Sequence, residues 1–182
     1  MNLPNILTLS RIGLLPFFIF FLSDPTPLNS FVAASIFGVA AITDWLDGMI
    51  ARRTGQVTKL GKLLDPVADK LLVSAALILL VDIGRAEAWI VIVLIGRKFA
   101  ITGLRAIASS EGIVVPAEAL GKYKMIAQIT AILLLILNYR IGPLDFFLLG
   151  TIALWASMIL AIWGGAQYFS NYWRQLGLGR GR

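Results

Sequence analysis

The chain lacks cysteine and histidine altogether, and these two absences narrow its chemistry. Without cysteine, disulfide bonds and thiolate chemistry are excluded. Without either residue, a bound metal ion can be held only by oxygen ligands, which favours Mg²⁺, Mn²⁺ or Ca²⁺. Charge is also scarce, because only 14% of the 182 residues are charged, whereas a soluble domain usually has about 25%.

Apolar residues make up 58% of the chain and occur in long runs, which predicts an integral membrane protein. Each run is long enough for a helix that crosses the bilayer. The first run lacks the basic start and cleavage site of a signal peptide. No repeat or linker interrupts the chain, so the prediction is a single all-α domain, residues 1–182, with transmembrane helices at roughly 5–22, 30–51, 66–83, 88–107, 120–138 and 143–168.

The first residues predict a short interfacial helix that leads into the first span. Pro4 suits the first turn of a helix. Asn5, Thr8 and Arg11 recur every three positions and so share one face. The alternative is a frayed terminus.

Basic residues predict the orientation in the membrane. Only Arg85 and Arg140 fall on one side of the predicted spans, and the other fourteen of the sixteen fall on the opposite side. By the positive-inside rule, both termini are expected in the cytoplasm, and we expect a bacterial inner (cell) membrane protein. The net charge of +6 does not indicate nucleic-acid binding, because no basic stripe with interleaved aromatic residues is present.

Two pairs of aspartates lie near the predicted cytoplasmic ends of the second and third spans. Asp44 and Asp47 are three residues apart, so their carboxylates share a helical face. Gly48 and Ala51 lie on that face and have almost no side chain. They allow either close helix packing or room for a ligand beside the acids, and the sequence leaves both open.

Gly61, Asp65 and Asp69 repeat this arrangement on the third span. Because Pro66 follows Asp65, one alternative is that Asp65 only caps a helix starting there. Salt bridges to nearby lysines and arginines are a second alternative. Ionisable groups within a span nevertheless indicate function. Two divalent cations would neutralise four acids and leave positions open for an anionic substrate, which points to phosphoryl chemistry on a lipid.

The full pattern is Asp44-x2-Asp47-Gly48-x2-Ala51-Arg52-x8-Gly61-x3-Asp65-x3-Asp69. It resembles the signature of the CDP-alcohol phosphotransferase family. The resemblance implies a six-helix membrane fold that transfers a phosphatidyl or similar group from a CDP-linked donor to an alcohol and releases CMP.

The resemblance also implies roles for individual residues. Two divalent ions, Mg²⁺ or Mn²⁺, would be bound by Asp44, Asp47, Asp65 and Asp69, with Asp69 also the general base. The CDP moiety of the donor would be contacted at or near the positions Asn5, Thr8, Asp44, Gly48, Ala51, Arg52, Thr58 and Gly61.

A second basic cluster predicts the site of the acceptor phosphate. Arg97 and Arg105 are eight residues apart, near enough to share a helical face, and Lys122 and Lys124 start the next span. Together they can form a pocket of fixed positive charge for a phosphate-bearing acceptor. The alternative is that all four only anchor the cytoplasmic side.

This region resembles the branch of the family that uses CDP-diacylglycerol as donor and glycerol 3-phosphate as acceptor. Related sequences tend to have Gly-Arg-Glu-Phe where this chain has Gly96-Arg97-Lys98-Phe99, so Lys98 reverses a charge beside the proposed pocket. Cardiolipin synthase-type and phosphatidylinositol-phosphate synthase-type enzymes remain alternatives, as does a divalent-cation transporter. The sequence is compatible with a homodimer.

Overall fold

The computed structural model describes the backbone of residues 3–54, 59–110 and 121–179, and the side chains of residues 9–43, 67–68, 70–110 and 121–175. The described chain is almost entirely helical, with one small antiparallel hairpin. In chain order the elements are α1 (Leu3–Ser23), α2 (Pro27–Thr54), α3 (Lys59–Asp82), α4 (Ala88–Ser110), α5 (Gly121–Leu137), β1 (Arg140–Ile141), β2 (Leu144–Asp145) and α6 (Phe146–Gly179).

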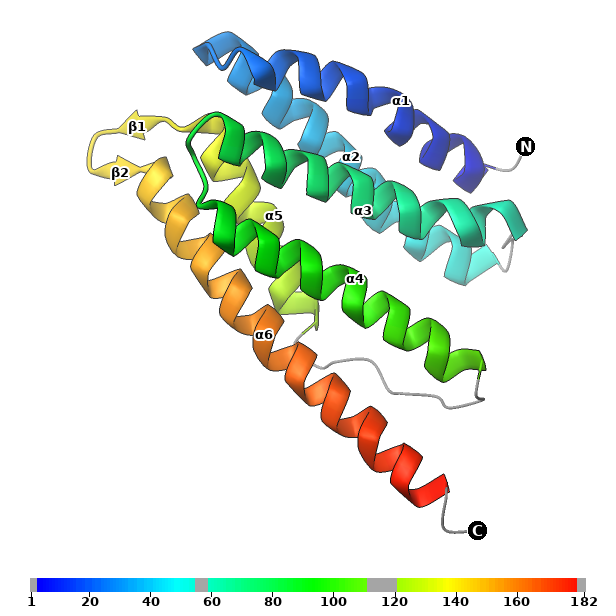
Figure 1. The fold of residues 1–182 in the computed structure, drawn as a ribbon. Helices are drawn as coiled ribbons and strands as arrows, with labels where there is room; N and C mark the ends of the chain where they lie inside the picture. The colour runs from blue at the N-terminus through cyan, green and yellow to red at the C-terminus, as the bar shows by residue number, and fades with distance from the viewer. Residues whose placement is uncertain (1–2, 55–58, 111–120, 180–182) are drawn as a thin grey trace.

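The six helices form one bundle in which successive helices run in opposite directions (Figure 1). α1 packs against α2 and α3, α5 against α6 and α2, and α4 against α6 and α3. We call the end where α1 begins and α6 ends the terminal end. The opposite end, with the turns at 24–26, 83–87 and 138–145, is the hairpin end. The predicted all-α class and six helices are confirmed.

Two expectations about helix starts are wrong. α1 is continuous from Leu3 to Ser23, so no separate short helix precedes the first long one. α3 begins at Lys59, six residues before Asp65. Asp65 therefore lies inside the helix, which excludes the alternative that it caps a helix starting at Pro66.

Among the described side chains, the apolar core lies in the half of the bundle nearer the hairpin end. It draws on the second halves of α1, α3 and α5 and the first halves of α2, α4 and α6, the segments that meet there. Phe18 and Phe37 are completely buried at its centre, with ring centroids 5.9 Å apart. This close packing fixes the helices relative to one another and leaves the terminal half to hold polar groups.

The outward faces of the bundle are also apolar. Large side chains that point outward include Phe20, Ile92 and Trp163, which are about two-thirds exposed or more. In the described part of the chain, one helix, Phe146–Gln175, is long and apolar enough to cross a membrane, with a mean hydropathy of 2.1. Leu9–Ser23 and Pro27–Thr43 are shorter apolar stretches.

Arg85 lies at the hairpin end and donates hydrogen bonds to the last backbone carbonyl groups of α5. Its Nη1 donates to Ile136 O at 2.6 Å and to Leu135 O at 3.2 Å. The final carbonyls of a helix have no partner within the helix, and a cation there also suits the helix dipole. Partial burial lowers the pKa of Arg85 from its ordinary value. The guanidinium thus joins the α3–α4 turn to α5.

The β-hairpin between α5 and α6 turns on Gly142, whose φ is +58°. Its strands pair Arg140 with Asp145 and Ile141 with Leu144, so the loop has only two residues. A positive φ at the first loop residue matches the twist of such hairpins and favours glycine. The predicted spans 120–138 and 143–168 left only a short connection here, and the two strands were not predicted.

Candidate functional site

The predicted metal-binding aspartates lie on the two helices that flank the α2–α3 connection. Asp44 and Asp47 belong to the second half of α2, and Asp65 and Asp69 to the first half of α3. Both helices pack against α1. The side chains of these aspartates lie outside the described residues, as do those of Asn5, Thr8, Gly48, Ala51, Arg52 and Gly61, and Thr58 lies outside them entirely.

A cavity of about 850 Å³ opens in the terminal half of the bundle, and its described lining is strongly basic. Apolar residues such as Phe37, Leu72 and Leu94 form its inner part, next to the core. None of its described lining residues is acidic. Seven are basic: Arg11, Lys70, Arg97, Lys98, Arg105, Lys122 and Lys124.

The cavity contains all four residues that the sequence predicted as the acceptor-phosphate site. Arg97 and Arg105 come from α4, and Lys122 and Lys124 from the first turn of α5. The predicted juxtaposition of these two segments is therefore present.

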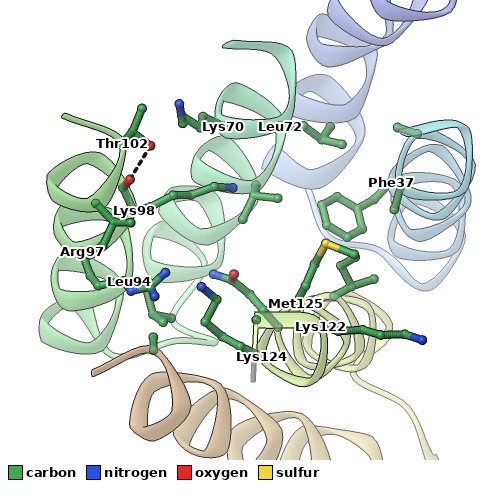
Figure 2. A pocket seen from close by; sticks show the side chains of 18 of the residues that line it. Phe37, Lys70, Leu72, Leu94, Arg97, Lys98, Thr102, Lys122, Lys124 and Met125 are labelled. Carbon is green, nitrogen blue, oxygen red and sulfur yellow. Dashed lines mark hydrogen bonds between the residues drawn. The ribbon is translucent and has the colours of Figure 1, made fainter. Parts of the chain in front are cut away.

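The four side chains are not equivalent. Figure 2 shows Arg97 and Lys124 pointing into the space between α4 and α5. Lys122 borders the cavity but extends away from the other labelled basic residues. Arg105 lies over the ring of Tyr168 on α6, with its Cζ 5.3 Å from the ring centroid. Arg97 and Lys124 therefore define the middle of the basic surface.

Three further cations that line the cavity were missing from the predicted site. Lys98 is half-buried and reaches across the cavity from α4, and Lys70 lies at the rim on α3 (Figure 2). Arg11 of α1 is only 2% exposed. The sequence held one signal for Arg11, its position on the polar face of α1 with Asn5 and Thr8.

Arg11 stands out because a buried charge costs several kcal/mol unless oxygen partners compensate it. Phe37, Ala40 and Leu72 line the same cavity from α2 and α3. Ala40 lies four residues before Asp44, about one helical turn. Arg11 belongs to α1, which packs against α2 and α3, the two helices that contain the aspartates.

The residue types present suit a hard divalent cation. Within the described residues, no group of three or more acidic, histidine or cysteine side chains is close enough to hold a metal ion. The four predicted aspartates of α2 and α3 lie outside the side chains on which this statement rests. Carboxylate oxygens are the ligands that Mg²⁺, Mn²⁺ and Ca²⁺ prefer.

The chain matches the CDP-alcohol phosphatidyltransferase family over residues 1–163, and it belongs to that family. The matched region includes α1 to α5, both aspartate pairs and all seven cavity cations. The family is membrane-embedded, and together with the apolar helix α6 this makes the chain a membrane protein.

Particular relatives are similar over nearly their whole length. A CDP-diacylglycerol–glycerol-3-phosphate 3-phosphatidyltransferase of Bacillus subtilis (strain 168) is 44% identical over 96% of this chain and 97% of its own. Proteins of the same description from Pseudomonas fluorescens and Rickettsia bellii (strain RML369-C) are 38% and 37% identical. The match to the Pseudomonas protein covers 97% of this chain and 92% of that protein. The match to the Rickettsia protein covers 92% of this chain and 93% of that protein.

Proposed function

We propose that the protein transfers the phosphatidyl group of CDP-diacylglycerol to glycerol 3-phosphate, which gives phosphatidylglycerophosphate and CMP. The relatives are transferases of this description over nearly the full chain. The observation in the structure that supports the proposal is the cavity, which has seven described cations and no described acid in its lining. Such a lining suits a small dianion.

Arg97 and Lys124 are the proposed ligands of the acceptor phosphate. Arginine offers a planar fork of donors that fits phosphate oxygens, and lysine adds a compact charge. The two residues come from different helices, so they can bind the phosphate from two sides. Arg105 and Lys98 add positive charge around it. Lys122, which points away, is expected to contribute least.

The reaction joins the acceptor to the donor phosphorus. A hydroxyl of glycerol 3-phosphate attacks the diacylglycerol-linked phosphorus, a new P–O bond forms, and the P–O bond to CMP breaks. We assign Asp69 as the base that accepts the hydroxyl proton. Asp69 lies one turn before Val73, which lines the cavity, so α3 connects the aspartate segment to the acceptor space.

Asp44, Asp47, Asp65 and Asp69 would hold two divalent ions, Mg²⁺ or Mn²⁺. When bound, such ions would stabilise the negative charge on the pyrophosphate and on the departing CMP. Arg52 and Gly48 are proposed to contact the nucleotide, with Asn5, Thr8, Ala51, Thr58 and Gly61 at or near it. Arg11 lines the same cavity as the acceptor cations, and its charge is proposed to favour the phosphoryl oxygens.

We further propose that all six helices cross the inner membrane of a bacterium, with the terminal end in the cytoplasm. Two aromatic pairs support this placement. Trp89 and Trp155 pack edge to face near the hairpin end, and Phe169 and Trp173 stack toward the terminal end. Trp155 and Trp173 are separated by about 27 Å along α6, close to the ~30 Å thickness of a hydrocarbon core with aromatic belts at both interfaces.

An acceptor panel tests the proposed function. Purified protein in detergent would be given CDP-diacylglycerol, Mg²⁺ and one acceptor at a time, and CMP release would be measured. Glycerol 3-phosphate should support release, whereas no acceptor, phosphatidylglycerol or inositol phosphate should not. Release only with phosphatidylglycerol or with an inositol phosphate would overturn the acceptor and keep the family chemistry.

A further inference from the structure

Helix α6 forms the outer wall behind the two arginines of α4, and it meets Arg97 at a glycine. A Cβ atom built on Gly165 would lie 3.4 Å from both Cγ and Nε of Arg97. Arg97 thus lies directly against the α6 backbone. A side chain longer than alanine at position 165 would occupy the space that the guanidinium now uses.

The second arginine meets α6 one turn further along. Tyr168 is 2% exposed, and Arg105 Cζ lies 5.3 Å from its ring centroid, within the range of a cation–π interaction. Residues 165 and 168 are three apart and share one face of α6. One face of α6 therefore contacts both arginines. Gly165 leaves space for Arg97, and the ring of Tyr168 packs against Arg105.

We propose that Gly165 and Tyr168 are positioning residues that set where Arg97 and Arg105 present their guanidinium groups to the acceptor phosphate. This inference rests on the proposed function. Arginine side chains are long and flexible, so contacts with a neighbouring helix limit the positions that their guanidinium groups can take. The absence of a side chain at Gly165 allows Arg97 to pack against α6. The ring of Tyr168 packs against the more exposed Arg105, which also lines the cavity.

Gly165→Leu is the first test. The atoms nearest the new side chain belong to the flexible Arg97, so the helix can keep its place while the guanidinium is displaced. The KM for glycerol 3-phosphate should rise by roughly 10- to 150-fold, the range expected for losing one charge-assisted hydrogen bond. The KM for CDP-diacylglycerol should stay within about 2-fold of wild type. Gly165→Ala should change both constants by about 2-fold or less, because 3.4 Å is an ordinary contact distance.

Two matched glycines control for effects on folding. A Cβ atom on Gly103 of α4 would meet open space, with no neighbouring atom within 4 Å, so Gly103→Leu should leave both KM values unchanged. A Cβ on Gly150 would lie 2.8 Å from Leu135 Cγ in the hairpin half. Gly150→Ala should therefore lower the melting temperature without separating the two KM values.

Tyr168 is tested with a conservative pair. Tyr168→Phe keeps the ring and should retain the KM for glycerol 3-phosphate within about 2-fold. Tyr168→Leu loses the aromatic face, so that KM should rise by roughly 2- to 5-fold, as expected for an exposed cation–π contact. In an Arg105→Ala background, Tyr168→Leu should add nothing further, because the two changes remove the same interaction.

The outcomes separate this inference from the function on which it rests. If wild-type protein ignores glycerol 3-phosphate, the proposed function fails. If wild type uses it and Arg97→Ala raises its KM, but folded Gly165→Leu and Tyr168→Leu do not, only the positioning role is overturned. An equal rise in the KM for both substrates would also overturn it, since that indicates a general distortion of the bundle.

Discussion

Arg97→Ala is the most direct perturbation of the basic cavity. Arg97 is half-buried, points into the space between α4 and α5, and lies on the same surface as Lys124. A hydrogen bond to a charged group contributes about 1.5–3 kcal/mol. Its loss should raise the KM for glycerol 3-phosphate by roughly 10- to 150-fold. The lower part of that range is expected, because neighbouring cations can take over part of the charge compensation.

The assay follows CMP release while each substrate is varied in turn. Arg97→Ala should leave the KM for CDP-diacylglycerol nearly unchanged, and Arg97→Lys should give an intermediate KM for glycerol 3-phosphate, since lysine keeps the charge but loses the fork. Arg140→Ala is the matched control, because Arg140 is exposed on the hairpin at the opposite end. It should behave as wild type.

Thermal unfolding adds an independent measurement. The melting temperature without substrate gives the baseline for each variant. Wild-type protein should be stabilised by glycerol 3-phosphate, by about 2.7 kcal/mol at a hundred times its Kd. Arg97→Ala should lose most of that gain at the same concentration. Unchanged kinetics together with an unchanged ligand-induced shift would refute the assignment of Arg97.

Three further outcomes are expected. EDTA should abolish CMP release and Mg²⁺ or Mn²⁺ should restore it, so full activity in metal-free buffer would contradict the two-ion proposal. Asp69→Asn should lower turnover by roughly 10²- to 10⁴-fold while donor binding is largely kept, and a near wild-type rate would exclude Asp69 as the base. Arg85→Met should lower the melting temperature without changing either KM, because Arg85 joins the α3–α4 turn to α5 at the hairpin end.

The helices were predictable from the sequence because apolar runs identify the parts that avoid water. Their ends were less predictable. The third span was predicted from 66, but α3 starts at Lys59, and the sixth was predicted to end at 168, but α6 continues to Gly179. Hydropathy reports only the apolar stretch, whereas hydrogen bonding continues the helix through the polar residues at either side.

The cavity was only partly predictable, because its residues come together through packing between helices. Arg97 and Arg105 could be paired by their spacing along one helix. Lys98 lies about 100° around α4 from Arg97, so spacing alone places it on another face, yet its long side chain reaches the same cavity. Arg11 and Lys70 come from α1 and α3, and no periodicity within one segment relates them to α4.

The division of the bundle into two halves explains how seven cations can border one cavity. Like charges that share a space repel one another, and burying them costs free energy that their partners must offset. The hairpin half offsets this cost with a dense core around Phe18 and Phe37 and with the link from Arg85 to α5. The hairpin half therefore contributes most to stability, and the proposed ligand site lies in the terminal half. The anions proposed to bind there account for Arg97 and Arg11, because a buried charge costs free energy that an apolar residue at the same position would avoid.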